Sequence, residues 1–347
     1  MFLKKNIPTN NSTNNSTNNS TNLDFLRTFA ILLVVFSHLP TSELSITKYY
    51  HTQTMGLLGV YIFFVHTSCV LMFSLERMGR IKKSTLIYKF YTQRLFRVYP
   101  LSIFAVLLFF FYNIINNNYI NLDLITLSKN IFLVQDINES MPPALWSLPY
   151  EVAMYFFFPL IFIFIKKGNG EKKIISLWLF FAIFIVTQKY FETSYYSTVV
   201  YVPFFLCGVI AFIYSKKIEN KKKIKSIYLV LYIFFSILLI PILINFVFKQ
   251  SLIGAIFCFP LGLLIAYCED MRTSIFSIFF KLIAKYSYGI YLLHQLIILV
   301  YYKYFNIDNK TFSLALLLIL IFLISATAYH LIEKPLIKFG KKISQRY

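Results

Sequence analysis

A few ionisable side chains lie inside long apolar runs of the sequence, where such groups are costly and usually face a packed interior or a wet cavity, and three of them are the main candidates for chemistry. They are Arg27, His38 and Glu151. A histidine titrates near neutral pH and can accept or release a proton, whereas a carboxylate in such a place needs a partner. These residue types indicate a buried site that moves protons.

The first apolar run places Arg27 and His38 near one face of a helix. Eleven residues separate them, which is close to three turns and roughly 16 Å along the helix axis. Glu151 is expected at a depth similar to that of His38. Other interpretations stay open: Arg27 as a topology anchor, His38 bonded to a nearby carbonyl, and Glu151 as a hydrogen-bond anchor between packed helices.

A second group of residues stands at the start of the third apolar run. Arg94 and Arg97 are three residues apart, so on a helix they are neighbours and could grip a phosphate. Tyr99 follows them and completes a candidate cofactor-binding group. The alternative is that both arginines are positive anchors at the membrane surface.

The remaining candidates are expected to contact a substrate or to support the site. Tyr291 and His294 lie on neighbouring turns of the ninth run, near its middle, with packing as the alternative role for the tyrosine. His66 in the second run is otherwise a satisfied structural histidine. The whole supporting group is Trp146, Ser147, Tyr291, His294 and His66. The four cysteines lie in or at the ends of different apolar runs and form no CxxC pair, so they are expected to be small buried hydrophobic residues. No metal site is expected.

The elements that carry these residues are apolar throughout. Hydrophobic residues make up 58% of the 347 residues and charged residues 14%, against about 25% charged in a typical soluble domain. An all-α, polytopic membrane protein with about ten transmembrane helices is therefore predicted. The candidate spans lie near 23–40, 56–75, 98–116, 148–165, 173–188, 197–214, 227–248, 250–268, 287–302 and 312–332.

The net charge of +20 is distributed unevenly over the loops. Lysine and arginine gather in alternate loops and after the last span, and the loops between them hold almost none. This is the positive-inside pattern, which predicts that both ends of the chain are cytoplasmic. Nucleic acid is not an expected partner, because the cations sit in short loops between apolar runs.

Three parts of the chain are distinguished. Residues 1–22 repeat Thr-Asn-Asn-Ser and are predicted to be a disordered polar tail, because such a tract buries no apolar surface. Residues 23–336 form the membrane domain, and residues 337–347 form a basic cytoplasmic tail. Glu333-Lys334-Pro335 is predicted to end the last span as a helix stop with a local ion pair.

Several of these blocks, taken in order, resemble the membrane acyltransferase 3 family of bacterial O-acyltransferases. The resemblance runs from residue 23 to about residue 336. One departure from the family pattern occurs at Val65-His66-Thr67-Ser68, where relatives commonly have an apolar residue followed by Ser-Gly-Phe. The blocks are Arg27 with His38, Gly59-Val60 with Phe63-Phe64, Arg94-x-x-Arg97-Val-Tyr99-Pro100, Trp146-Ser147-Leu148-x-x-Glu151 with Tyr155 and Pro159, Tyr288-x-x-Tyr291-Leu-x-His294, and Glu333-Lys334-Pro335.

The resemblance implies transfer of an acyl group, most often acetyl, from acyl-CoA to a hydroxyl of a cell-surface carbohydrate. The donor would be acetyl-CoA or another acyl-CoA. The acceptor would be a surface glycan or a lipid-linked saccharide such as O-antigen or capsule. The protein is expected in the bacterial inner membrane, in contact with its lipids.

Residue roles follow from the same resemblance. His38, Glu151 and Arg27 are expected to be catalytic. In this hypothesis His38 removes the proton of the acceptor hydroxyl and Glu151 orients or charges it. Arg94, Arg97 and Tyr99 are expected to bind the coenzyme.

Composition alone also allows two other classes of protein. A glycolipid or polysaccharide transporter, or flippase, would have similar spans and buried polar groups, and discontinuous helices at matching positions of two halves would support it. The motif-bearing spans are unlike one another, so this symmetry is missing from the sequence. A polysaccharide polymerase would be expected to have longer outer loops than the one near 117–145.

Overall fold

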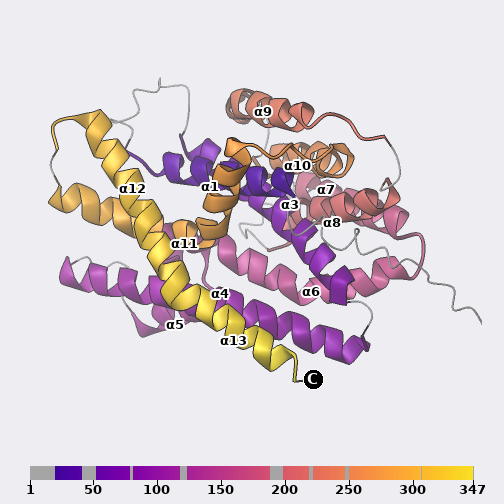
Figure 1. Ribbon diagram of the computed structural model, residues 1–347, viewed down its shortest axis with the longest axis horizontal. Helices are drawn as coiled ribbons and strands as arrows, with labels where there is room; N and C mark the ends of the chain where they lie inside the picture. Colours follow the sequence, from indigo (N-terminus) through magenta and orange to yellow (C-terminus); the bar gives the residue numbers. More distant parts are fainter. Residues whose placement is uncertain are drawn as a thin grey trace, which may run out of the picture.

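The computed structural model describes residues 20–40, 52–78, 81–117, 123–187, 198–218, 222–246, 250–305 and 307–346. Within these ranges the chain forms helices and no strand, apart from an isolated bridge between Ile224 and Cys268. The all-α prediction is confirmed. Figure 1 shows the helices gathered into one bundle.

Each of the ten predicted spans corresponds to a helix, although the predicted limits at residues 188, 197 and 248 lie outside the described ranges. The helices are α1 (Thr21–Ser37), α3 (Thr52–Met78), α4 (Lys83–Ile115), α6 (Leu148–Lys166), α7 (Gly170–Thr187), α8 (Val202–Lys217), α9 (Ile227–Phe246), α10 (Gln250–Tyr267), α11 (Ile275–Tyr304) and α12 (Lys310–Ala328). Shorter elements join them: α5 (Leu124–Phe132), the 3-10 helices η1 (Ile137–Glu139), η2 (Pro143–Ser147) and η3 (Thr198–Tyr201), the π-helical turn η4 (Tyr329–Glu333), and α13 (Lys334–Ser344).

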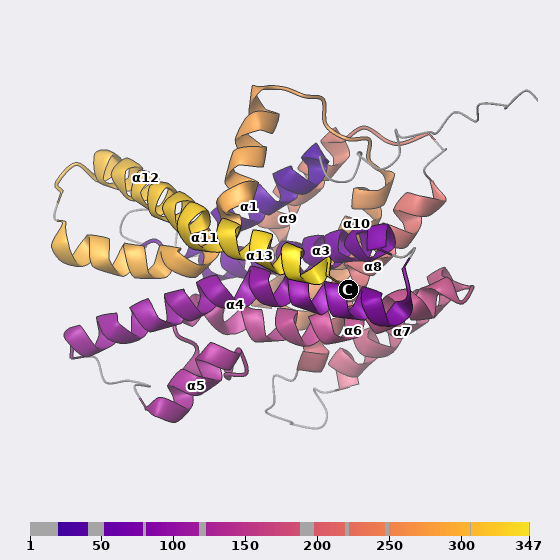
Figure 2. The same cartoon turned by 60° about the horizontal axis from the view of Figure 1, so that its bottom comes forward.

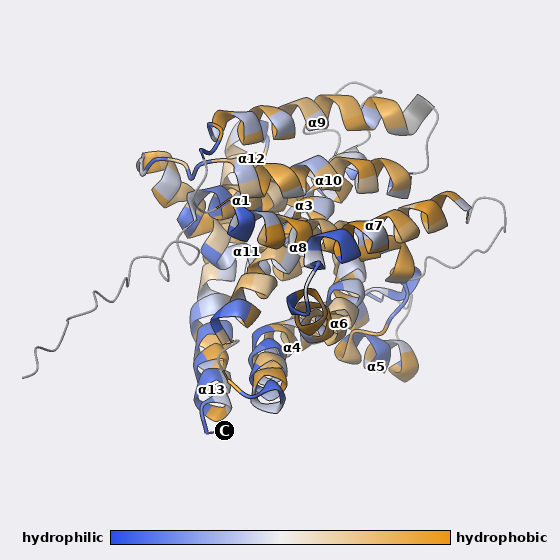
Figure 3. Cartoon of the chain, turned by 90° about the vertical axis from the view of Figure 1, so that its right-hand side faces the viewer, coloured by the Kyte–Doolittle hydropathy of each residue, from blue (hydrophilic) through white to orange (hydrophobic). Residues whose placement is uncertain are grey.

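Seven of the described helices are long and apolar enough to cross a membrane. The predicted spans outside that group are shorter or more polar: α1 has 17 residues, α7 carries three charged residues in its first turn, and α9 contributes the shorter apolar stretch Ile227–Leu243. Figure 3 shows hydrophobic residues along most of α7, α9 and α10. The polytopic prediction is confirmed, and a total of ten spans stays a prediction.

Helix α1 joins two sides of the bundle. It packs against α3 and α11, while α3 also packs against α8, and α8 against α10. The approach of α1 to α3 is close at Gly59, where an added Cβ would lie only 2.6 Å from the carbonyl oxygen of Ala30. Small residues allow membrane helices to approach in this way. Glycine is therefore required at the contact that holds α1 in place.

The start of α1 is tied to the loop before α11. The carboxylate of Asp270 accepts hydrogen bonds from the backbone N–H groups of Thr21 and Asn22, at 3.1 and 2.9 Å, and from the Ser20 hydroxyl at 3.0 Å. A carboxylate at this position satisfies N–H groups that have no partner inside the helix. The Thr28 hydroxyl donates to the carbonyl of Phe280 in α11 at 2.8 Å. These contacts set the register between α1 and α11.

The structure extends helical order into both predicted tails. Thr21 and Asn22, assigned to the disordered tail, form the first turn of α1, and the rest of that tail, residues 1–19, lies outside the described ranges. Most of the predicted basic tail belongs to α13, which runs along α4 (Figure 2). The rings of Phe96 and Phe339 are 5.4 Å apart. Apolar packing on one side of this basic helix explains its order.

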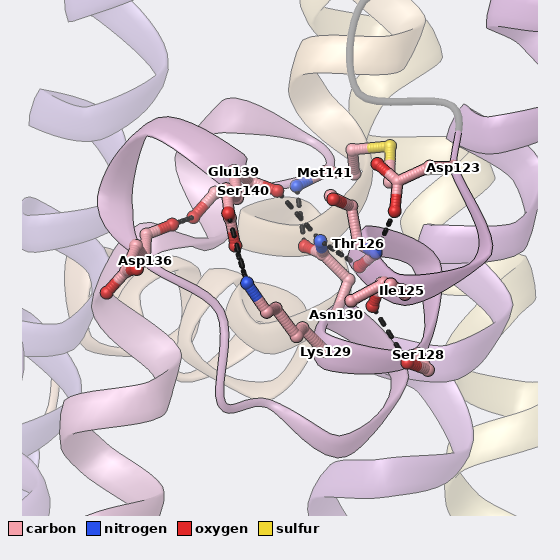
Figure 4. Close-up of polar contacts among 10 residues, drawn as sticks. All are labelled: Asp123, Ile125, Thr126, Ser128, Lys129, Asn130, Asp136, Glu139, Ser140 and Met141. Atoms are coloured by element: carbon pink, nitrogen blue, oxygen red, sulfur yellow. Dashed lines mark hydrogen bonds and ion pairs between the residues drawn. The ribbon is translucent and has the colours of Figure 1, made fainter.

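The chain between α4 and α6 is folded around the buried side chain of Asn130 (Figure 4). Its amide donates to the carbonyls of Thr126 and Glu139, at 2.9 and 2.7 Å, and accepts from the N–H of Met141 at 2.7 Å. Lys129 forms an ion pair with Glu139 at 2.9 Å beside it. One side chain thereby fixes the path of the chain into η2.

Candidate active site

A small cavity between α1, α3, η2, α6 and α11 is lined by four of the eleven predicted site residues. Its volume is about 60 Å³. The structure thus brings Arg27 of the first span next to Glu151 of the fourth. The cavity is lined by Arg27, Phe63, Phe64, Thr67, Ser147, Leu148, Glu151, Ser287, Tyr288 and Tyr291.

Glu151 faces a group of arginines that we call the arginine cluster, formed by Arg27, Arg94 and Arg97. All three lie within electrostatic range of its carboxylate. The Tyr155 hydroxyl donates a hydrogen bond to Glu151 Oε1. Because Tyr155 follows Glu151 by four residues, α6 presents both side chains on one face. The carboxylate is therefore held by cations and a phenol.

Arg97 also pairs with a second buried carboxylate. Its Nη1 lies 2.7 Å from Oε1 of Glu333, whose side chain is fully buried while that of Arg97 is 26% exposed. Within the described ranges, Glu333 therefore forms an ion pair with Arg97 and not with its expected neighbour Lys334. The expected helix stop is also absent, since η4 leads directly into α13. A buried carboxylate needs a cation, and the packing of α13 on α4 supplies one.

Arg94 belongs to the cluster, whereas Tyr99 does not. The Tyr99 hydroxyl donates to the carbonyl of Phe132 at the end of α5, at 3.3 Å. Residues two apart on a helix are about 200° apart, so Tyr99 and Arg97 project to opposite sides of α4. Arg94 Nε is buried and has no hydrogen-bond acceptor in the described part of the chain. Such an unmet donor favours an anionic ligand.

His38 caps the other end of α1 and meets His294 of α11. Its Nδ1 lies 2.8 Å from the carbonyl oxygen of Val34 and 3.4 Å from Nε2 of His294. The two rings are edge to face, with centroids 5.0 Å apart and an interplanar angle of 70°. His294 is fully buried, and its Nδ1 lies 2.8 Å from the carbonyl oxygen of Tyr291. We call these two residues the histidine pair.

The expected pairing of His38 with Glu151 is not what the structure shows. Among the described residues, the polar contacts of His38 are with Val34, Ser37 and His294. The 3-10 helix η2 explains the difference, since residues 143–147 reach α11 before α6 begins. Glu151 therefore lines the cavity with Arg27, away from His38.

The helix η2 connects the cavity with the histidine pair. Ser147 Oγ and the Tyr291 hydroxyl are 2.7 Å apart, and Tyr291 donates to the carbonyl of Ala144. One turn further along α11, Gln295 Oε1 accepts from the N–H of Ala144 at 2.8 Å. These contacts lie on both sides of His294 in the sequence. The predicted supporting residues Ser147, Tyr291 and His294 are thus brought together.

The other two supporting residues lie at the edges of the site. Trp146 is half-buried and packs against Tyr150 and Tyr201, with ring centroids 6.1 and 5.9 Å away. His66 is buried in α3 within electrostatic range of Arg27. Trp146 belongs to an aromatic group next to η2, and His66 borders the arginine cluster.

Three residues of the site were not among the site residues predicted from the sequence. Tyr155 binds Glu151, Glu333 binds Arg97, and Tyr288 lines the cavity and donates to the carbonyl of Val98 at 2.7 Å. Tyr155 and Tyr288 each lie one turn from a predicted site residue on the same face, which is a usable signal. Glu333 offered no such signal, because its partner lies on a helix far away in the sequence.

A family model described as an acyltransferase domain matches residues 20–330, which include every predicted site residue. No curated protein and no solved structure matches the chain.

Proposed function

Because the chain belongs to the acyltransferase family whose model matches residues 20–330, and because its helices are those of a membrane protein, we propose a specific transfer reaction for this membrane acyltransferase. It moves an acyl group, acetyl in the simplest case, from acyl-CoA to a hydroxyl of a cell-surface carbohydrate.

One observation carries this proposal: α1 and α11 each connect an anion-attracting site with the histidine pair. Arg27 and His38 lie on α1, separated by eleven residues or roughly 16 Å. On α11, Tyr288 and Tyr291 line the cavity beside Arg27, and His294 follows one turn later. Two substrates that approach from opposite ends of α1 would meet between these groups.

The arginine cluster is suited to an anionic donor. Three guanidinium groups stand near Glu151, two of them, those of Arg27 and Arg97, also near Glu333. Asp24 is shared between Arg27 and Lys281. Guanidinium groups bind phosphate with paired, charge-assisted hydrogen bonds. The cavity of 60 Å³ has room for roughly four to six water-sized groups. In the proposal the phosphates are held at the arginine cluster, and the thioester arm of acyl-CoA runs through the cavity toward the histidine pair, where the acyl carbon reacts.

His38 is proposed as the general base. The acceptor O–H bond breaks as its oxygen bonds to the acyl carbon, and the C–S bond of the thioester breaks. The His38 ring takes the hydroxyl proton and returns it to the leaving sulfur, so CoA departs as a thiol. In this proposal Glu151 holds the arginine cluster in place and does not act on His38.

The positive-inside pattern supports a bacterial inner-membrane location with both ends of the chain in the cytoplasm. The arginine cluster would then lie on the side where acyl-CoA is made. The histidine pair would lie toward the opposite side, where the acceptor, a surface glycan or lipid-linked saccharide, would be located. Membrane lipids are the other expected partners, and no nucleic acid is expected.

The test is acyl transfer in membranes that contain the protein or its His38→Ala variant. Radiolabelled acetyl-CoA is the donor, and lipid-linked and surface glycans are extracted and counted. Label in the glycans that falls about 10²- to 10⁴-fold without His38 is expected for loss of a general base. Equal labelling by a well-expressed His38→Ala protein would refute the role of His38. No label with any of several acyl-CoA donors would favour the transporter alternative.

A further inference from the structure

The proton positions of His294 follow from its contacts. Its Nδ1 lies 2.8 Å from the carbonyl oxygen of Tyr291 and 3.0 Å from that of Ile290. A carbonyl oxygen only accepts hydrogen bonds, so Nδ1 must carry a hydrogen. In the neutral ring, the lone pair is then on Nε2. This is the nitrogen that faces His38.

The same reasoning fixes the proton of His38. Its Nδ1 is 2.8 Å from the carbonyl oxygen of Val34, so Nδ1 carries a hydrogen here as well. Two further acceptors lie near the same nitrogen: Ser37 Oγ at 3.2 Å and the Nε2 lone pair of His294 at 3.4 Å. The remaining nitrogen of neutral His38, Nε2, has its lone pair available for a proton. The two assignments are compatible, because Nδ1 of His38 carries a hydrogen where Nε2 of His294 has a lone pair.

We propose that His294 is a positioning residue that keeps His38 in the tautomer with a basic Nε2 and stabilises the imidazolium form of His38. The inference rests on the proposed function, in which His38 accepts the acceptor's proton. When Nε2 of His38 takes that proton, the positive ring still donates its Nδ1–H to Val34 and to the lone pair of His294. A neighbouring ring with its Nε2 lone pair on this side stabilises the charge as it forms.

The packing around His294 is suited to such a task. Tyr291 and Gln295 fix α11 to η2 just before and after His294, through Ala144 and Ser147. On the other side, α1 is held to α11 by the bond between Thr28 and Phe280. The separation between the two rings is therefore set by helix packing, which keeps a positioning group in place.

Three variants of His294 separate this role from simple packing. In His294→Gln, Oε1 occupies the place of Nε2 and can still accept from His38 Nδ1. In His294→Asn, the polar atoms lie at the place of Nδ1, so the acceptor is lost while size and polarity are largely kept. His294→Phe fills the space without any acceptor. The hydrogen bonds of Nδ1 are dispensable, because these helical carbonyls also accept from the backbone.

The readouts are kcat, the KM for acyl-CoA and the melting temperature of the purified full-length protein. We expect kcat of His294→Asn and His294→Phe to fall about 10- to 100-fold, as for other orienting partners. The KM for acyl-CoA stays unchanged, because the arginine cluster is intact. His294→Gln is expected to keep a kcat about tenfold above that of His294→Asn, which corresponds to one retained hydrogen bond.

The possible failures are distinct. Full kcat in His294→Asn, together with an inactive His38→Ala protein, would overturn the positioning role and leave the proposed function intact. Equal losses in the Gln and Asn variants, with unchanged melting temperatures, would also overturn it, because the Nε2 acceptor would then be irrelevant. Full transfer by His38→Ala would overturn both. If His294→Phe does not fold, the comparison of Gln with Asn still decides.

Discussion

The two ends of the site are organised by different forces. In the arginine cluster, Arg27 and Arg97 hold the carboxylates of Glu151 and Glu333 by charge, with little demand on angles. In the histidine pair, backbone carbonyls and one neighbouring ring determine which nitrogen carries the hydrogen. One end therefore concentrates cations around buried carboxylates, and the other orients two imidazole rings through backbone carbonyls.

The largest effect on stability is expected from Arg97→Met. This change leaves the buried carboxylate of Glu333 without its cation, and breaking such a pair costs about 3–5 kcal/mol. The melting temperature in detergent measures it. At the other end, His38→Ala should leave the melting temperature nearly unchanged, since the Val34 carbonyl still accepts from the Ser37 hydroxyl at 2.7 Å.

The double variant Arg97→Met, Glu333→Gln tests the reason for that loss. Neutralising the orphaned carboxylate should recover part of the stability, and the two changes should be strongly non-additive. Additive losses would mean that the ion pair is not what stabilises α13 against α4.

The next largest effect separates the two ends kinetically. Arg27→Met should raise the KM for acyl-CoA by about 10- to 150-fold, because a hydrogen bond to a charged group contributes about 1.5–3 kcal/mol. The kcat should change far less than in the variants of the histidine pair. Arg27→Lys is the matched control and should lie between, since it keeps the charge without the planar fork. A lower kcat at unchanged KM would contradict the proposal that the arginine cluster binds acyl-CoA while the histidine pair transfers the proton.

A smaller effect on the kinetics is expected from the loop before η2, which acts on the histidine pair only through η2. Asn130→Ala leaves the Met141 N–H and the Glu139 carbonyl without partners, at about 1–3 kcal/mol for each unsatisfied group. Hydrogen exchange at Met141 should become faster and kcat should fall, with the KM for acyl-CoA unchanged. Ser128→Ala removes an exposed hydroxyl of the same helix and serves as the control. Slow exchange at Met141 in the Asn130 variant would show that the loop is held by other contacts.

The smallest effect belongs to the exposed ion pair of this loop. The hydrogen bond to Glu139 raises the pKa of Lys129 above its ordinary value. The stabilisation is therefore complete below the unfolded pKa and is lost only as the pH rises through the folded pKa, well into the alkaline range. Lys129→Met should lower the melting temperature slightly at neutral pH, and the difference from the wild type should vanish at high pH. A difference that grows with pH would contradict this.

The spans were predictable because apolar runs of this length are rare outside membranes. Their starts were less predictable where basic residues extend the helix. Helix α4 begins at Lys83 and α11 at Ile275, well before the predicted limits of 98 and 287. A span predicted from hydropathy ends at lysine and arginine, although these residues are good helix formers. In α4 the basic part of the helix also packs against α13.

That some of the buried polar residues lie together was predictable, but their pairings were not. Buried ionisable residues had to gather somewhere, and Arg27 and Glu151 do so. The partner of His38 depends on how α1 meets α11, which no local pattern encodes. The position of Tyr99 was accessible from the sequence alone, because two residues along a helix point in nearly opposite directions.

The bonds from Asp270 to the first turn of α1 also have a consequence for biosynthesis. Ser20 and Asp270 are 250 residues apart, and at about 5–20 residues per second the ribosome needs roughly 10–50 s to bridge them. During that interval α1 is present without α11, which later packs against it. Arg27 has Asp24 beside it, but Glu151 is added only about halfway through and Glu333 only after α11 and α12. Helix α1 is thus made long before α11, the helix against which it packs. A nascent chain stopped before α11 is expected to leave α1 accessible to protease, and a chain stopped after α12 is expected to protect it.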